Sequence, residues 1–116
     1  MSTDIPSAAA AIDMILEPTG QRAGADRGDP QTSSATVYND GRSHVGVWEC
    51  TPGGWPVVDR DATEVATIVK GRAILTDADG TERALVPGTV IVQPKGWTGR
   101  WDVIETVRKV FTIVTP

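Results

Sequence analysis

A lysine within the last hydrophobic run of this 116-residue chain is its most unusual candidate for chemistry. Side chains of an extended strand alternate between two faces, so Lys109 shares one face with Val107, Phe111 and Ile113. If that face points into the protein, the ammonium group needs an ionic partner or a lowered pKa. Lys109 is therefore a candidate for anchoring an anion, for moving a proton or for acting as an amine nucleophile. The structural alternative is a lysine whose stem is packed while its amine stays in water.

Glu64 is the second ionisable candidate, because it begins a regular spacing of turn-forming residues. Six residues separate Glu64 from Gly71, and five separate Gly88 from Pro94, with Gly96 two positions further on. Together these segments resemble the two sequence motifs of the cupin superfamily. The glutamate of the first motif points into the barrel in cupins, so the resemblance implies an inward Glu64.

The resemblance covers residues 36–114 and is closest to one branch of the cupins. This branch is the compact single-domain group that includes the cupin domains of ureidoglycine aminohydrolase and of ethanolamine-utilisation proteins. The resemblance implies a mainly β protein with an antiparallel jelly-roll β-barrel, the RmlC-like cupin fold. Because this fold hosts several enzyme classes and non-catalytic binders, it does not fix the function. Beyond the two motifs, the likeness rests on Trp55 and on residues 46–53, 77–80, 98–101 and 105–109.

The resemblance would also imply a metal site, but the expected ligands are missing. Cupins usually take two histidines from an H-x-H just before the glutamate and a third from beyond the second motif. Imidazole nitrogen supplies affinity and geometry for first-row metals in such sites. The sequence therefore predicts no metal and no other cofactor. The expected histidine positions hold Val58 and Arg60, or Val57 and Asp59 in the alternative count, and Gly99.

An atypical metal site is an open alternative. The single histidine, His44, lies outside both motifs but could join Asp59 and Glu64. Carboxylates with one distant imidazole match iron or zinc poorly. We therefore expect His44 to be an ordinary strand residue, either exposed or hydrogen-bonded.

The missing third histidine predicts an opening inside the barrel at Gly99. Alternation along the strand then directs Trp101 and Val103 inward together with Gly99. Arg100 and Asp102 should point outward.

The predicted ligand site combines this opening with the two charged candidates. Trp97 and Trp101 flank the opening, and their flat apolar faces with an indole N–H suit stacking on a sugar or a planar ring. Glu64 and Lys109 are expected to pair inside the barrel and are also the catalytic candidates. The predicted ligand-binding residues are Glu64, Trp97, Gly99, Trp101 and Lys109.

The other two tryptophans and two polar residues receive secondary predictions. We expect Trp48 or Trp55 at a barrel end or an interface, and core or interface packing for at least two of the four tryptophans, since this is the commoner role of tryptophan. Glu49 and Gln93 are secondary candidates for the pocket lining, because their neighbours do not fix their direction.

The composition excludes several classes of partner. Eleven basic and fifteen acidic residues give a net charge of -4, which disfavours binding to nucleic acid or to an anionic membrane surface. No apolar run approaches the ~20 residues that cross a bilayer, and the acidic start is wrong for a signal peptide. The single cysteine, Cys50, excludes an intrachain disulfide and agrees with a reducing compartment. We therefore expect a cytoplasmic protein.

Turn residues about every ten positions predict strands from Ala35 onward. Residues 1–35 are rich in Ala, Gly, Asp, Pro and Ser and are predicted as an N-terminal arm, and residues 36–116 as a single cupin domain. Breaks are predicted at residues 51–54, 77–80 and 86–88. The predicted strands are 35–38, 44–50, 65–70, 72–76, 82–85, 89–93, 99–104 and 107–114.

These observations predict a metal-free cupin that binds a small polar metabolite, carboxylated or nitrogen-bearing, in its barrel pocket. One alternative is a metal-independent isomerase or lyase in which Glu64 or Lys109 moves a proton. Another is a structural or regulatory cupin without a ligand. A homodimer is expected from the resemblance and from the unassigned arm, which a partner subunit could exchange.

Overall fold

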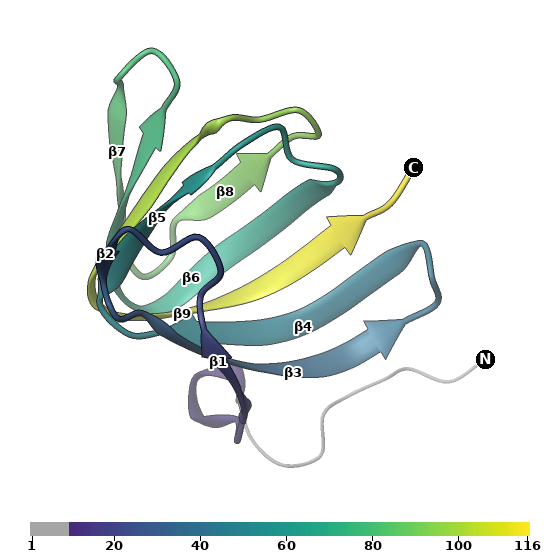
Figure 1. Cartoon of the computed structure of the whole chain (residues 1–116). Helices are drawn as coiled ribbons and strands as arrows, with labels where there is room; N and C mark the ends of the chain where they lie inside the picture. The colour runs from purple at the N-terminus through teal and green to yellow at the C-terminus, as the bar shows by residue number, and fades with distance from the viewer. Residues whose placement is uncertain (1–9) are drawn as a thin grey trace.

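Strands are the main secondary structure of the computed structural model, which describes residues 10–116 (Figure 1). Every strand pair in this part of the chain is antiparallel, which confirms the predicted mainly β class. The elements are the 3-10 turn η1 (Ala11–Asp13) and the strands β1 (Glu17–Gln21), β2 (Arg27–Gly28), β3 (Gln31–Asn39), β4 (Ser43–Cys50), β5 (Gly53–Val57), β6 (Thr63–Asp77), β7 (Glu82–Leu85), β8 (Val90–Gln93) and β9 (Gly99–Val114).

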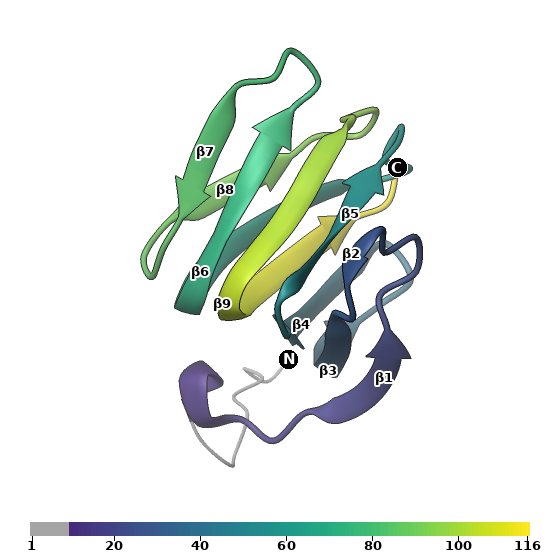
Figure 2. The ribbon, with the colours of Figure 1, turned by 60° about the vertical axis from the view of Figure 1, so that its left-hand side comes forward.

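The two longest strands, β6 and β9, pair along their lengths and pass through both layers of the curled sheet. In one layer, the start of β9 pairs with β5 and the end of β6 pairs with β7 (Figure 2). In the other layer, the end of β9 pairs with β4, and the start of β6 pairs with β8. A single sheet thus folds over on itself as a jelly roll, as predicted for a cupin.

The bend of β6 is made possible by Gly71 of the first motif. Gly71 has a φ of +80°, and a Cβ atom added there would collide with the carbonyl of Thr106 on β9. The register between the two strands shifts on both sides of this point, between Ile68 and Ala73. Only glycine allows the two backbones to approach so closely in this conformation.

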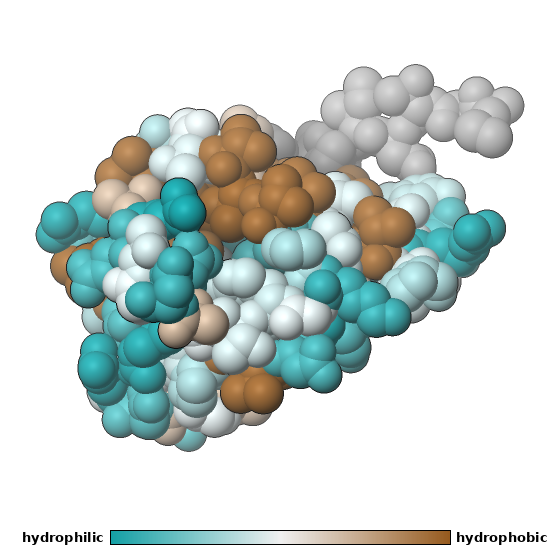
Figure 3. Space-filling model, turned by 90° about the horizontal axis from the view of Figure 1, so that it is seen from above, coloured by the Kyte–Doolittle hydropathy of each residue, from teal (hydrophilic) through white to brown (hydrophobic). Residues whose placement is uncertain are grey.

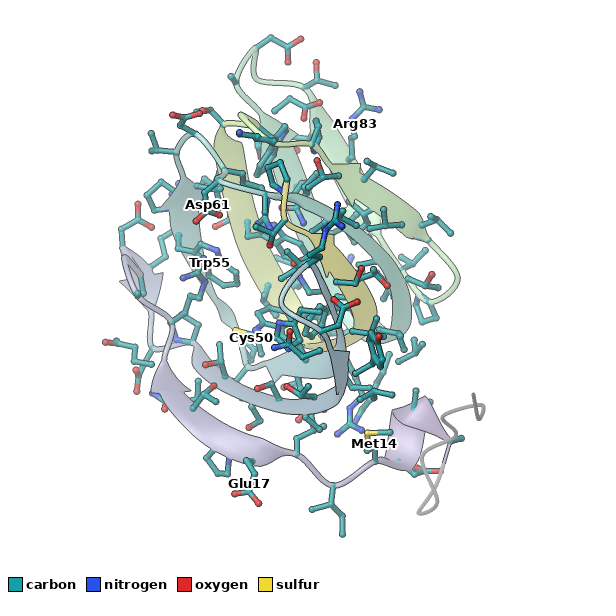
Figure 4. The ribbon with its side chains drawn as sticks, turned by 90° about the vertical axis from the view of Figure 1, so that its right-hand side faces the viewer. Met14, Glu17, Cys50, Trp55, Asp61 and Arg83 are labelled. Carbon is teal, nitrogen blue, oxygen red and sulfur yellow. The ribbon has the colours of Figure 1, made fainter. Side chains whose placement is uncertain are left out.

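Alternate residues of the strands are buried in the interior of the curled sheet, and Figure 4 labels two of these residues, Cys50 on β4 and Trp55 on β5. On β6, Glu64, Ala66 and Ile68 are buried while Val65 is exposed, which is the period of two expected for a strand. Cys50 is fully buried, and desolvation raises the pKa of its thiol to about 11. It is therefore an inert core residue.

Several predicted strand boundaries were wrong. The break predicted at residues 51–54 is shorter, because β5 already begins at Gly53. Residues 65–70 and 72–76 belong to the single strand β6, and residues 99–104 and 107–114 belong to the single strand β9. The first predicted strand, 35–38, begins earlier, at Gln31.

The described part of the predicted arm 1–35 packs on the sheet of its own chain. It contributes η1, β1, β2 and the first residues of β3, while residues 1–9 lie outside the described residues. Arg108 on β9 donates hydrogen bonds to the carbonyls of Ala11 and Met14 at 2.9 and 2.8 Å and so anchors η1. Arg108 also pairs with Glu49 at 3.1 Å, and Glu49 is not among the residues that line the interior pocket.

The outer surface carries a cluster of exposed valines on neighbouring strands. Val65 on β6 and Val90 and Val92 on β8 are 39%, 64% and 59% exposed. Figure 3 shows hydrophobic residues gathered in a patch on the face seen from above. Among residues 10–116, no helix is long and apolar enough to span a membrane.

Candidate functional site

A buried ion pair joins the two charged residues that the sequence singled out. Lys109 Nζ donates a hydrogen bond of 2.6 Å to Glu64 Oε2, and the two side chains are only 8% and 6% exposed. β6 and β9 are paired, and both residues occupy inward positions of their strands. The predicted contact between Glu64 and Lys109 is therefore present.

Two further side chains fix the Glu64 carboxylate. Gln93 on β8 donates from Nε2 to Glu64 Oε2 at 3.3 Å and accepts from Trp101 Nε1 at 3.0 Å through its Oε1. Gln93 is 1% exposed, and Trp101 is 2% exposed. The chain of hydrogen bonds holds the carboxylate in one orientation, and it makes Gln93 a part of the site rather than a secondary candidate.

Two tryptophans contact the lysine, and a third stacks on one of them. The Lys109 ammonium lies 4.4 Å from the ring centroid of Trp48 and 4.7 Å from that of Trp101. Trp55 on β5 stacks on Trp101 with a centroid distance of 5.9 Å and an interplanar angle of 4°. Trp55 is packed in the core, as expected for at least two of the tryptophans, and both Trp48 and Trp55 also line the interior pocket, which the sequence did not predict. Their aromatic faces stabilise a cation at the Lys109 position.

Burial lowers the pKa of Lys109 below its ordinary value of 10.5. Desolvation is the largest cause, and the positive charges of Arg60 and Arg22 act in the same direction, while Glu64 opposes them. A smaller free energy is therefore needed to remove the proton from this amine than from a lysine in water.

The wild-type free energy of unfolding should rise with pH on the alkaline side because of Lys109. Between the lowered pKa and 10.5, the unfolded chain binds more protons than the folded chain, so stability increases with pH in that interval and is flat below it. Lys109→Met should lack this contribution. Urea unfolding of both proteins between neutral pH and 10.5 measures the difference, and parallel pH profiles would contradict the assignment.

Two arginines add positive charge to the same pocket. Arg60, in the loop before β6, places Nη2 at 3.5 Å from Glu64 Oε1. Arg22, directly after β1, lies with its guanidinium carbon 5.2 Å from the centroid of the Trp55 ring. The cavity has a volume of about 460 Å³ and is lined by three cationic side chains and one carboxylate, Arg22, Arg60, Lys109 and Glu64. Sequence reasoning missed both arginines as site residues, although Arg60 occupies a position where cupins carry a histidine ligand.

Trp97 and Gly99 do not line this cavity. The predicted opening at Gly99 was wrong, because the ring of Trp97 already occupies the space beside it. Trp97 Nε1 donates to Asp77 Oδ1 at 3.0 Å, and the ring faces a separate cavity between β7 and β8. Trp101 and Val103 are buried as predicted, while Arg100 and Asp102 pair at 2.9 Å with about a fifth of each side chain exposed.

Gly99→Ala should destabilise the fold by about 2 kcal/mol through overpacking. A Cβ atom at this position would collide with the carbonyl of Thr76 and with the Trp97 ring. Thermal unfolding followed by circular dichroism measures the loss. A variant as stable as the wild type would show that the space beside Gly99 is open after all.

The residues of the pocket do not fit the metal that cupins usually hold. Glu64 is contacted by the Lys109 ammonium and the Arg60 guanidinium, so a divalent cation would lie against two fixed positive charges. In the described chain, His, Cys, Asp and Glu side chains form no group of three suited to a metal ion. His44 contacts Thr36 at 3.0 Å and the edge of the Phe111 ring, and the Asp59 amide donates to Thr98.

Comparison with known proteins supports the fold. The model of the EutQ-like cupin domain family matches residues 37–111. No curated protein matches the chain. The match to this family confirms the predicted likeness to the cupin domains of ethanolamine-utilisation proteins, and the likeness to ureidoglycine aminohydrolase stays a prediction.

Solved structures share this fold at low sequence identity. A protein of unknown function from Pseudomonas syringae pv. tomato has a TM-score of 0.81 at 21% identity, covering 88% of this chain and 45% of that one. The chain thus spans less than half the length of that protein. The EutQ protein of Clostridium difficile gives a TM-score of 0.65 at 16% identity, over 74% of this chain and 69% of that one. A cupin superfamily protein from Desulfitobacterium hafniense gives 0.68 at 14% identity, over 98% and 97%.

Proposed function

Because this chain belongs to the EutQ-like cupin family, we propose that its curled sheet binds a small molecule, and that this molecule is a polar metabolite carrying a carboxylate. The observation that carries the proposal is the charge of the pocket. Three cationic side chains and one carboxylate line it, in a chain whose net charge is -4. Clustered positive charges repel one another, but together they attract an anion into the cavity.

The guanidinium groups are the groups that would bind the carboxylate. In residues 10–116, no carboxylate lies within 4.0 Å of Arg22, whose Nη1 donates at 3.3 Å to the carbonyl of Ala23. Arg60 uses Nε for the carbonyl of Ala62 and one Nη for Glu64, which leaves further N–H groups for a ligand. Guanidinium forks suit carboxylates because both are planar and can form two parallel hydrogen bonds.

The remaining lining suits the rest of a small metabolite. Trp48, Trp55 and Trp101 provide apolar walls against which a carbon skeleton or a flat ring can pack. Thr19 and Thr32 bring hydroxyl groups to the cavity from β1 and β3. Such a mixture of aromatic walls and a few polar groups is common in small-molecule sites.

A thermal-shift screen of small carboxylates tests the proposal. A compound that binds the folded state raises the apparent melting temperature, and the shift should shrink as salt screens the charges. Arg60→Gln and Arg22→Gln should each reduce the shift, because each removes one cation from the pocket. Arg42→Gln is the matched control, since Arg42 is exposed in the β3–β4 turn. The proposal fails if no carboxylate stabilises the protein, or if the Arg42 variant loses as much as the pocket variants.

A second candidate is a metal-independent isomerase or lyase that uses Glu64 and Lys109 for proton transfer. It is favoured by the 2.6 Å contact between an amine of lowered pKa and a fixed carboxylate. Such an enzyme should show a bell-shaped dependence of rate on pH that Glu64→Gln abolishes while the protein stays folded. If no ligand binds and no activity is found, the remaining candidate is a structural or regulatory cupin without a ligand.

We also propose that the chain forms a homodimer through the valine patch of β6 and β8. Val65, Val90 and Val92 are exposed apolar residues on neighbouring strands. Two copies of a chain with net charge -4 repel each other, so an uncharged face is the place where they can meet. Light scattering should give twice the mass of the chain, and Val92→Lys should reduce it to the monomer mass. A monomer mass for the wild type would contradict the dimer.

A further inference from the structure

Lys109 differs from the other lysines of the chain in its surroundings. Lys70 and Lys95 are exposed, whereas the Lys109 amine lies inside the pocket and contacts the Glu64 carboxylate at 2.6 Å. Binding a carboxylate would not by itself require a buried amine, since Arg22 and Arg60 also line the cavity. Carboxylate binding by the arginines therefore does not explain why the Lys109 amine lies in the cavity beside the Glu64 carboxylate.

We propose that Lys109 is an amine nucleophile that forms an imine with a small oxo-acid, a molecule that carries both a carboxylate and a ketone or aldehyde group. This inference rests on the proposed function, because the arginines would hold the carboxylate. In addition to the carboxylate, the ligand must carry a carbonyl group, and this group must lie beside the Lys109 amine. The pairing of a nucleophile with a positioned base is the arrangement that activates such side chains.

The reaction balances with the groups of the pocket alone. Glu64 takes a proton from the Lys109 ammonium, and the neutral amine attacks the carbonyl carbon to form a carbon–nitrogen bond. One amine hydrogen moves to the former carbonyl oxygen, which gives a carbinolamine. Glu64 then returns its proton to that hydroxyl, water leaves, and a protonated imine remains beside the Glu64 carboxylate. No oxidant, reductant or metal takes part.

The surroundings favour the protonated imine as well as the ammonium. Trp48 and Trp101 present their rings at 4.4 and 4.7 Å from the nitrogen, and a ring face stabilises either cation. Gln93 holds Glu64 in place through a hydrogen bond of 3.3 Å, so the proton acceptor does not need to reorient. Burial of Lys109 favours the neutral amine that must attack.

Reductive trapping of the wild-type protein tests the proposal with pyruvate as the probe. Cyanoborohydride reduces an imine to a stable secondary amine, which adds a pyruvate-derived mass to one lysine. Peptide mapping should find this mass on Lys109, with little on Lys70 or Lys95. Lys109→Met should lose the adduct completely, and Lys95→Met should keep it. Because the adduct is located in the wild type, the test does not depend on the stability of either variant.

Propionate separates failure of this inference from failure of the proposed function. It has the carboxylate of pyruvate but no ketone, so it should stabilise the protein without forming an adduct. Stabilisation by both acids with no adduct on Lys109 would overturn the imine and leave carboxylate binding intact. Adducts spread over Lys70, Lys95 and the amino terminus would overturn the imine as well. If no carboxylate of the thermal-shift screen stabilises the protein and pyruvate forms no adduct, both proposals are overturned.

Discussion

Glu64→Gln should reduce the free energy of unfolding by about 3 kcal/mol, because it leaves the Lys109 ammonium buried without its carboxylate. The remaining charged neighbours, Arg60 and Arg22, are positive and make the loss worse. A glutamine has nearly the same shape as glutamate and preserves packing, so the change in the free energy of unfolding measures the effect of the lost carboxylate charge. Urea unfolding measures it, and the exposed pair of Arg72 and Glu105 provides the control, since Glu105→Gln should change stability by less than ~0.5 kcal/mol.

The double variant Glu64→Gln with Lys109→Met should recover most of that loss. Removing both charges leaves no buried ion without a partner, and the methionine stem can pack against the tryptophan rings. The coupling free energy from the four proteins then isolates the ion pair. Additive losses from the two single variants would show that the contact between Glu64 and Lys109 contributes nothing specific to the fold.

Gly71→Ala should cost about 3 kcal/mol, through strain and collision together. Gly71 has a φ of +80°, which disfavours a residue with a Cβ, and that Cβ would collide with the backbone of Thr106. Because the obstacle is backbone and not the end of a side chain, β6 and β9 must separate to admit it. The bend that carries Glu64 and Lys109 into one interior would be distorted.

Gly88→Ala is the matched control for Gly71→Ala. Gly88 has a φ of +93°, but the space around its missing Cβ is open, so this variant carries the conformational strain alone and should lose only about 1 kcal/mol. Thermal and urea unfolding of the two variants give the difference. Equal losses would mean that Gly71 is needed for its backbone conformation and not for the approach of the two strands.

Sequence reasoning located the ion pair because both residues lie within regular strands. Side chains of a paired strand alternate between its two faces, so the residue count along β9 correctly predicted that Lys109 and Trp101 point inward. Trp97 was predicted to line the pocket only because it flanks Gly99 in the sequence, and it lies in the turn before β9, where no sheet fixes the direction of a side chain. The opening at Gly99 was predicted from the missing histidine, and the sequence did not show that the Trp97 ring occupies this space.

Strand β5 shows why a turn-like sequence misled the prediction. Gly53 and Gly54 suggested a break, but they are glycines because neighbouring groups occupy the space of their Cβ atoms. Pro30 lies against Gly53, and the side chains of Arg100 and Asp102 lie over Gly54. These neighbours are distant in sequence, so no local pattern could reveal them. Trp55 follows these glycines on β5, and the sequence did not predict that it lines the pocket.

The two arginines of the pocket differ in how far the sequence could have revealed them. Arg60 is four residues before Glu64 and stands where a cupin has a metal-binding histidine, so that position indicated a charged group in the interior. Arg22 belongs to a segment without hydrophobic periodicity, and its place over Trp55 follows only from the folded sheet. At one of the expected histidine positions this chain thus carries the fixed positive charge of Arg60 in place of an imidazole.

A crystal structure of the protein with the most stabilising carboxylate tests the central claim directly. We expect the ligand in the interior pocket, with its carboxylate within hydrogen-bonding distance of the Arg60 or Arg22 guanidinium and its carbon skeleton against Trp55 or Trp101. The claim would be contradicted by a ligand in the cavity between β7 and β8, beside Trp97, with the interior pocket empty.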